Sequence, residues 1–284
     1  MKSHRYVTTI IYLYYILFFV LPFVVLPVNS ELFEFNKMLF IYAIAILIGG
    51  MWILRCFQEK RFVIRKSPFD IPLALFLCSQ IVSTLVSIDT HTSIFGYYGR
   101  FNGGLLSTFT YMFLYYAFIS NLEINKKEIV RVLLGISIAS SIGVVLWGIP
   151  GKFNHDLSCL LFTNKFDNTC WTAQFKPAER MFSTLGQPNW LGAYLAVNFF
   201  LSVFILFSSQ TRRSRILGGV GVLFSYGGIL LSRSRSSMAS LIPGVILLCT
   251  FILILIFRKS HWISTFRKKV FIFGIGCVFS NFSF

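Results

Sequence analysis

The most informative shortage in this 284-residue sequence is charge. Only 13% of its residues are Asp, Glu, Lys or Arg, whereas 56% are hydrophobic and the mean hydropathy is +0.73. Soluble domains carry about 25% charged residues. The composition therefore excludes one soluble domain of ordinary size and indicates an all-α, polytopic integral membrane protein, because in lipid only a helix satisfies the backbone of a single apolar run.

Acidic residues are the scarcer charged type, at 10 Asp and Glu against 26 Lys and Arg. A net charge of +16 could indicate a nucleic-acid-binding protein. The basic residues stand in short clusters between apolar runs, however, where the positive-inside rule places them. We therefore expect contact with membrane lipids and no nucleic-acid partner. No Asp-x-Asp pair that could hold a metal occurs in the segments assigned to the outer side, and no metal or cofactor is expected.

A signal-peptide cleavage site of the small-x-small type is also absent after the first apolar run, which we expect to remain as an uncleaved helix. Nine apolar runs are predicted to be membrane helices: Tyr6–Val28, Met38–Leu54, Ile71–Ile88, Leu105–Ser120, Val132–Ile149, Trp190–Phe207, Leu217–Leu231, Met238–Phe257 and a run that begins at Val270. The ninth is still apolar at Phe284. Residues 1–284 are thus expected to form one membrane domain, apparently truncated within the ninth helix.

Basic residues divide unequally between the two sides that these runs define. Counting on alternate sides places 18 of the 26 Lys and Arg on the side of the N-terminus and 8 on the other, which predicts a cytoplasmic N-terminus. The longest extracytoplasmic loop is then 151–189. Its two cysteines, Cys159 and Cys170, could form a disulfide there, or they could be unrelated, since spacing alone does not decide.

Arginines on the predicted outer side run against the positive-inside bias. Arg100 lies between two aromatic and glycine-rich stretches, and Arg180 precedes a Gly-Gln-Pro-Asn turn. Arg233 and Arg235 alternate with serines in a link so short that at least one of them lies at or inside the bilayer boundary.

These arginines indicate an anion site, because a planar guanidinium makes paired hydrogen bonds with phosphate. Ser234 could add a hydroxyl, and Asn189 marks a helix start whose free N–H groups favour an anion. The candidate substrate-binding residues are Arg180, Arg235, Arg100, Arg233, Ser234 and Asn189. The alternative for each arginine is a side chain that snorkels to the interface.

Three stretches of the sequence resemble the bacterial O-antigen ligase and O-antigen polymerase superfamily. The first, RMFSTLGQPNWLGAYLA, is similar to the signature R-x-x-S-x-x-G-x-P-N-x-x-A/G-x-Y-L, with matches at Arg180, Ser183, Gly186, Pro188, Asn189, Gly192, Tyr194 and Leu195. The second, LLSRSRSSMASL, matches a T-x-S-R-G/S-x segment at Ser232, Ser234, Arg235 and Ser236. The third, GRFNGGLLSTFTY, matches R-x-N-G-x-L-T at Arg100, Asn102 and Gly103. The resemblance covers about 89–257, would continue beyond the end of the chain, and extends to the earlier helices by topology only.

The resemblance implies a metal-independent glycan transferase in the bacterial plasma membrane, with its active side extracytoplasmic. Such an enzyme moves a glycan from an undecaprenyl-pyrophosphate carrier to a lipid, glycan or protein acceptor. Arg180 and Arg235 would bind the pyrophosphate. The catalytic residue is unknown, because the family's histidine base is expected in a large loop beyond Phe284, and neither His91 nor His155 matches its position. The chain could therefore be an incomplete, inactive fragment.

Two other classes of protein remain open. A transporter or flippase of an anionic or lipid-linked solute would place charges near mid-helix, whereas here they gather at the outer ends. A structural membrane component would leave the arginines of the predicted outer side without a purpose. The acceptor, the sugar and the oligomeric state are not indicated by the sequence.

Overall fold

The computed structural model describes residues 2–27, 31–122, 126–172 and 175–258 as an assembly of helices. The elements are α1 (Lys2–Val20), η1 (Leu21–Phe23), α2 (Glu34–Glu59), α3 (Asp70–Leu85), α4 (Thr90–Phe95), α5 (Leu105–Asn121), α6 (Lys126–Lys152), α7 (Leu157–Thr163), η2 (Ser183–Leu185), α8 (Pro188–Ser208), α9 (Arg212–Ser232) and α10 (Arg235–Arg258). Across these four ranges there is no strand, so the all-α prediction is confirmed.

Each of the first eight predicted runs overlaps a helix, although the run from Tyr6 continues past the end of α1 at Val20 through η1. Five helices are long and apolar enough to cross a membrane within those ranges, namely α1, α2, α6, α8 and α9. Helix α3 and the part of α10 up to Thr250 are shorter apolar helices. The ninth run, from Val270, lies outside the described residues. The structure thus supports a membrane protein with five candidate spans.

Helix ends are set by local chemistry. The side chains of Asp89, Asp156 and Thr211 accept hydrogen bonds from backbone N–H groups at the starts of α4, α7 and α9. Lys60 and Arg233 adopt left-handed backbone conformations where α2 and α9 end. The short helices α4 and α7 lie in segments that we had expected to be loops, because one or two turns carry too few residues for a periodic pattern.

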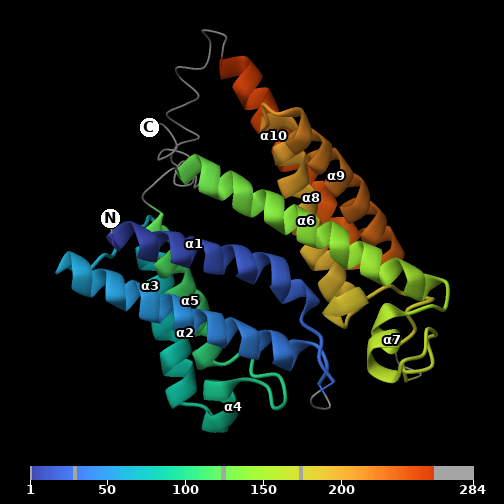
Figure 1. Ribbon diagram of the computed structural model, residues 1–284, viewed down its shortest axis with the longest axis horizontal. Helices are drawn as coiled ribbons and strands as arrows, with labels where there is room; N and C mark the ends of the chain where they lie inside the picture. The colour runs from blue at the N-terminus through green and yellow to red at the C-terminus, as the bar shows by residue number, and fades with distance from the viewer. Residues whose placement is uncertain (1, 28–30, 123–125, 173–174, 259–284) are drawn as a thin grey trace.

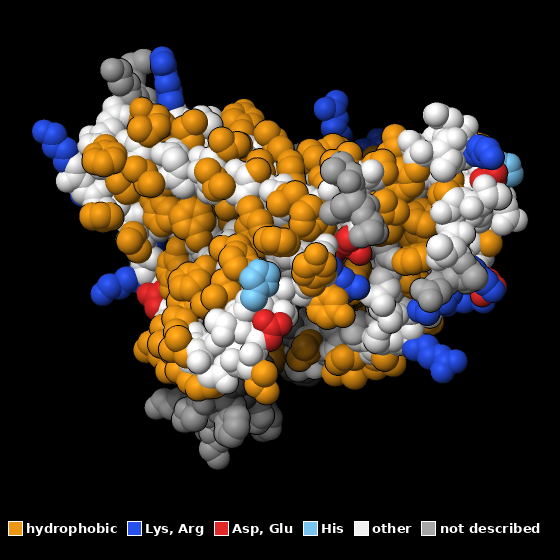
Figure 2. Space-filling model, turned by 90° about the horizontal axis from the view of Figure 1, so that it is seen from below, with side chains coloured by type: hydrophobic (Ala, Val, Ile, Leu, Met, Phe, Trp, Pro, Cys, Tyr) orange, Lys and Arg blue, Asp and Glu red, His pale blue; other side chains and the backbone are white. Residues whose placement is uncertain are grey.

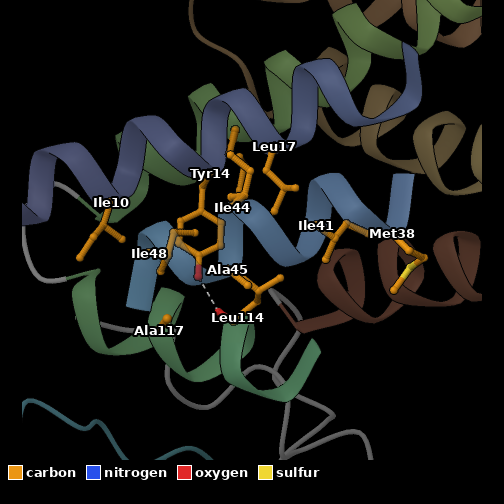
Figure 3. Close-up of a cluster of buried hydrophobic side chains, with 11 residues drawn as sticks. Ile10, Tyr14, Leu17, Met38, Ile41, Ile44, Ala45, Ile48, Leu114 and Ala117 are labelled. Carbon is orange, nitrogen blue, oxygen red and sulfur yellow. Dashed lines mark hydrogen bonds between the residues drawn. The ribbon is translucent and has the colours of Figure 1, made fainter. Parts of the chain in front are cut away.

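The N-terminal helices pack around a core shared by α1, α2 and α5 (Figure 3). Ile10 of α1 and Ile48 of α2 are fully buried there. The hydroxyl of Tyr14 donates to the carbonyl oxygen of Leu114 at 2.6 Å, which ties α1 to α5. This bond satisfies a buried polar group inside an otherwise apolar cluster.

A second core joins α6, α8 and α9, the long helices on the right of Figure 1. Val144 of α6, Leu195 of α8 and Ile229 of α9 are fully buried in it. Ser137 of α6 also donates to the side-chain carbonyl of Asn198 in α8 at 2.8 Å. Helices α1 and α6 pack against each other and so join the two groups.

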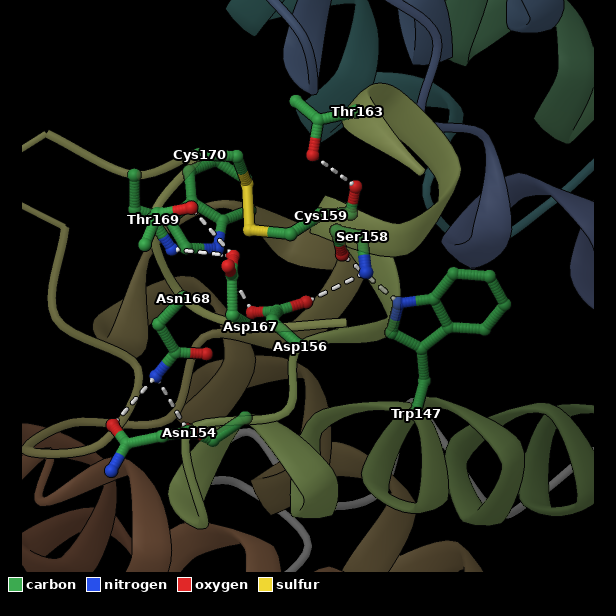
Figure 4. The surroundings of a disulfide bond; sticks show 12 residues. Trp147, Asn154, Asp156, Ser158, Cys159, Thr163, Asp167, Asn168, Thr169 and Cys170 are labelled. Carbon is green, nitrogen blue, oxygen red and sulfur yellow. Dashed lines mark hydrogen bonds between the residues drawn. A yellow bond between two sulfur atoms is a disulfide. The ribbon is translucent and has the colours of Figure 1, made fainter. Parts of the chain in front are cut away.

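The loop that contains α7 closes one end of these helices. A disulfide joins Cys159 of α7 to Cys170, and hydrogen bonds surround it (Figure 4). The buried carboxylate of Asp156 accepts from the backbone N–H of Ser158 and from the indole of Trp171. The side chain of Trp171 then stacks on Phe33 at the start of α2. The loop is therefore folded against the N-terminal half of the chain.

Apolar side chains cover much of the face shown in Figure 2. Viewed from below, they spread over both halves of the visible face, while Lys and Arg side chains project mainly at its edges (Figure 2). Large exposed hydrophobics lie on nearly every long helix, including Ile46 of α2, Leu75 of α3 and Leu223 of α9. A soluble protein rarely exposes so much contiguous apolar area, and a lipid-facing one does.

Candidate anion-binding site at the start of α8

A sharp turn places the first residues of α8 next to the loop that precedes it. Gly186 has φ +80°, and a Cβ there would lie 2.5 Å from the ring of Phe33. Gln187 is extended, and Pro188 supplies the preset φ of a first helical residue. No side chain caps this end of α8. The turn thus leaves the N-terminus of α8, the positive end of the helix dipole, open to an anion.

Arg180 lies directly in front of that helix start. Its Nη2 donates to the side-chain oxygen of Asn189 at 3.1 Å, and its Nε donates to the carbonyl oxygen of Ser232 at 3.3 Å. The next residue, Met181, is fully buried, and its N–H donates to the carbonyl of Leu231. The side chain is therefore held between the start of α8, through the side chain of Asn189, and the end of α9, through the backbone of Ser232.

The charge of Arg180 is not neutralised by a carboxylate anywhere in the described ranges. Both of its hydrogen-bond acceptors are uncharged. A guanidinium has five N–H donors, so three of them remain for a ligand. An oriented cation with unused donors at a helix N-terminus is an arrangement that binds anions.

Arg100 approaches the same region from the loop before α5, but its charge is compensated. Its Nη1 lies 3.4 Å from a carboxylate oxygen of Glu34, and Asn102 donates to the other oxygen of Glu34 at 2.7 Å. The guanidinium also lies over the rings of Tyr97 and Trp190, at 5.3 and 5.5 Å from their centroids. Arg100 therefore fixes the 97–102 loop to α2 and to the first turn of α8.

A cavity of about 590 Å³ lies between these groups. Its lining residues are Glu31, Phe33, Arg100, Phe175, Lys176, Glu179, Arg180, Phe182, Gly186, Gln187, Pro188, Asn189 and Trp190. Two of its acids are engaged: Glu31 accepts from the N–H groups of Phe33 and Glu34, and Glu179 pairs with Lys176 at 3.1 Å. Arg180 is therefore the lining cation that keeps its charge available for a ligand.

Of the six predicted site residues, the structure brings three to this cavity: Arg100, Arg180 and Asn189. Arg233 and Arg235 do not line it. Arg233 is the exposed, left-handed residue that ends α9, and its charge acts on the nearby Lys152 of α6. Arg235 is the exposed first residue of α10.

Ser234 also lies away from the cavity, because its hydroxyl is committed to the start of α10. The side chain is fully buried, its oxygen lies 2.9 Å from the hydroxyl of Ser237, and it accepts from the Ser237 N–H at 3.4 Å. This is the position and bonding of a helix N-cap. The serines of this link therefore hold the helix start rather than line the cavity.

Sequence reasoning missed residues that line the cavity or support it. Glu34 was counted only among the acids of the predicted outer side and Trp190 only as the start of a helix, although both contact Arg100. Lys37 was counted only as a topological charge, yet its buried ammonium donates to the carbonyls of Val24 and Thr184, behind the wall of the cavity. A lysine directly before an apolar run was the available signal, since a charge at that place needs partners.

Neither candidate histidine contributes to the cavity lining. His155 contacts the carbonyl of Phe153 through Nδ1, and His91 packs against Phe95. Asp167, in the same 151–189 loop as His155, receives hydrogen bonds from Thr169, and these hold the pKa of its carboxyl below the ordinary value. Nowhere in the described ranges do three His, Cys, Asp or Glu side chains meet in a group that could hold a metal ion.

Comparison with known proteins gives no further guidance. No protein-family model, curated protein or solved structure matches this chain.

Proposed function

We propose that the cavity at the start of α8 binds the pyrophosphate of a lipid-linked glycan. In this proposal the chain serves a membrane glycan transferase of the O-antigen ligase or polymerase type, on the extracytoplasmic face of a bacterial plasma membrane. The observation that carries it is Arg180, a cation oriented by two uncharged acceptors and lacking a carboxylate partner in the described ranges. The resemblance of the Arg180–Leu195 stretch to that superfamily supports it.

The chemistry of transfer explains why such a residue is useful. An acceptor oxygen attacks the first carbon of the sugar, the bond from that carbon to the phosphate oxygen breaks, and the bonding electrons leave with undecaprenyl pyrophosphate. The acceptor's proton passes to a base. Fixed donors that meet the departing oxygens stabilise the charge that develops there. Arg180 and the first turn of α8 would do this for the donor, and the base stays unassigned.

Binding of the carrier lipid tests this role directly. The purified protein in detergent would be titrated with undecaprenyl pyrophosphate, with undecaprenol as the uncharged comparison. Arg180→Lys keeps the charge but removes the planar fork, so we expect affinity for the pyrophosphate to fall about tenfold or more, and binding of undecaprenol to stay unchanged. Arg213→Lys, at the opposite end of α9, is the matched control and should bind like the wild type.

Arg235→Lys separates the geometry from the sequence resemblance. The resemblance implies that Arg235 and Arg180 matter equally, whereas the cavity includes only Arg180. We expect the Arg235 variant to lose less affinity than the Arg180 variant. Equal affinity of wild type and Arg180→Lys for undecaprenyl pyrophosphate would refute the assignment.

A further inference from the structure

A second basic site lies at the other end of α2, where the chain leaves the helix. Lys60 takes a left-handed conformation, and residues 60–66 then run without regular secondary structure along the ends of α2 and α5. We call residues 60–66 the strap. A cavity of about 310 Å³ is lined by Arg61, Phe62, Val63, Ile64, Arg65 and Ser120.

Two hydrogen bonds hold the strap against the helices. The indole of Trp52 donates to the carbonyl oxygen of Val63 at 3.0 Å, and the N–H of Arg65 donates to the hydroxyl of Ser120 at 3.1 Å. Val63 is buried at 7% exposure, whereas Phe62 and Ile64 on either side of it are 89% and 64% exposed. The strap is therefore fixed by its centre and turns two large apolar side chains outward.

The strap carries more positive charge than its neighbours neutralise. Glu59 pairs with both the buried Arg55 and the exposed Arg61, so one carboxylate serves two arginines. Asp70, the next acid along the chain, accepts from the Ser67 N–H and from the hydroxyl of Tyr116. In the part of the chain that the structure describes, Lys60, Arg65 and Lys66 have no carboxylate partner.

We propose that the strap binds the headgroup of an anionic phospholipid, with Arg61 and Arg65 at the phosphate and Phe62 and Ile64 among the acyl chains. The arginines flank Val63 on the cavity, and both exposed apolar side chains belong to the same short segment. A soluble anion would use the cations alone and would leave Phe62 and Ile64 in water, whereas a lipid satisfies both. This proposal is independent of the site at α8.

Thermal stabilisation by added lipid tests the strap. The protein in a neutral detergent would be titrated with dioleoylphosphatidylglycerol, and the midpoint of the Tm rise would be recorded. Each cation near an anionic surface strengthens attraction roughly fivefold, so Arg61→Gln with Arg65→Gln should raise the midpoint about 25-fold. Arg212→Gln with Arg213→Gln removes the same charge elsewhere and should leave the midpoint within about twofold of the wild type, since those residues lie outside the cavity.

Two further arms keep the test decisive. Phe62→Ser with Ile64→Ser retains every charge, including both partners of the Arg61–Glu59 pair, and should also weaken phosphatidylglycerol stabilisation. Glycerol 3-phosphate, which has the charge without the chains, should not stabilise the wild type. The proposal is overturned if the two arginine pairs behave alike, if the serine variant binds like the wild type, or if glycerol 3-phosphate stabilises as well as the lipid.

Discussion

Single side chains decide which arginine of the cavity is free to bind a ligand. Arg100 and Arg180 look equivalent in the sequence, since each precedes a glycine-containing turn and an apolar helix. In the structure Arg100 is paired with Glu34, and Arg180 is held by Asn189 and the Ser232 carbonyl. An arginine held by uncharged acceptors keeps its electrostatic attraction for an anion. In an arginine that is paired with a carboxylate, the negative charge cancels much of that attraction.

Asn189 is a positioning residue for Arg180, and this predicts a non-additive pair of variants. Asn189→Ala should weaken undecaprenyl pyrophosphate binding about tenfold, because the guanidinium loses one of its two fixed acceptors. In an Arg180→Lys background the same change should have little further effect, since there is no fork left to orient. A double-mutant cycle of affinities measures this, and additive losses would show that Asn189 acts on its own.

Gly192 shows how the resemblance motif also serves packing. A Cβ at this position of α8 would lie 2.3 Å from the hydroxyl oxygen of Ser237 and 2.9 Å from the Cβ of Ser234, so the glycine lets α10 approach α8. We expect Gly192→Ala to destabilise the protein by about 1–3 kcal/mol through overpacking. Thermal unfolding in detergent checks this.

Gly227 of α9 is the control for that substitution. A Cβ there would meet nothing within 4 Å. Gly227→Ala should therefore be neutral or slightly stabilising, because alanine is the better helix former. If both alanine variants melted at the wild-type temperature, the close approach of α8 and α10 would not be required.

At the residue scale, local chemistry could be predicted from the sequence and long-range pairing could not. The turn at Gly186 to Asn189 and the start of α8 depend only on residues that are adjacent in the sequence, so both could be predicted. The pairing of Arg100 with Glu34 depends on two segments 66 residues apart (100 minus 34) that meet only after α1, α2 and α5 have packed. The capping of α10 by Ser234 was visible in the sequence as a serine before a helix, but was assigned to a ligand.

Among the elements, the 151–189 loop depends most on a covalent constraint. The disulfide between Cys159 and Cys170 closes a segment with a sequence separation of 11, and Trp171 next to it packs on Phe33 and Phe182 in the wall of the cavity. Closing a loop of this size stabilises the folded segment by about 3 kcal/mol. The loop should therefore hold the cavity wall in place.

Removing the disulfide should loosen this loop without unfolding the helices. We expect Cys159→Ser with Cys170→Ser to speed proteolytic cleavage within 151–189 and to weaken carrier binding, while overall helix content by circular dichroism stays the same. Cys78→Ser, at an exposed cysteine of α3, is the control. Dithiothreitol should reproduce the effect in the wild type, and a loop equally protected in all these proteins would contradict the prediction.

The hydrophobic runs predicted where the helices lie better than they predicted which helices could cross a membrane. Helix α5 follows the predicted run closely, yet it is only 17 residues long and carries several Ser, Thr, Tyr and Asn residues, and it is not among the candidate spans. Those polar side chains are used in packing: Ser120 holds the strap, and Asn121 accepts from the buried Arg55. A run's mean hydropathy does not reveal which of its polar groups will find partners after folding.

At the scale of the whole molecule, the two proposed sites lie at opposite ends of α2. The cavity at the start of α8 includes Glu31 and Phe33, which precede α2, whereas the strap follows its last residue, Glu59. A helix of 26 residues rises about 39 Å at about 1.5 Å per residue, enough to cross a bilayer. If α2 spans the membrane, the cavity at the start of α8 and the strap face opposite membrane surfaces. This arrangement fits a site for the carrier lipid on one surface and a site for an anionic phospholipid on the other.

Sidedness is the prediction that joins these sites to the membrane. The distribution of Lys and Arg predicts that the 151–189 loop is extracytoplasmic and that the start of α9 is cytoplasmic. Both Lys165 and Arg213 are exposed, so either position can carry a reporter cysteine. In a background where serine replaces the cysteines outside the disulfide, a membrane-impermeant maleimide should label Lys165→Cys in intact cells. It should label Arg213→Cys only after permeabilisation, because α8 separates the two positions by one crossing. Labelling of both positions in intact cells would contradict a membrane crossing between them. Labelling of Arg213→Cys alone would indicate the opposite orientation, and the α8 cavity would then face the wrong side for an extracytoplasmic donor.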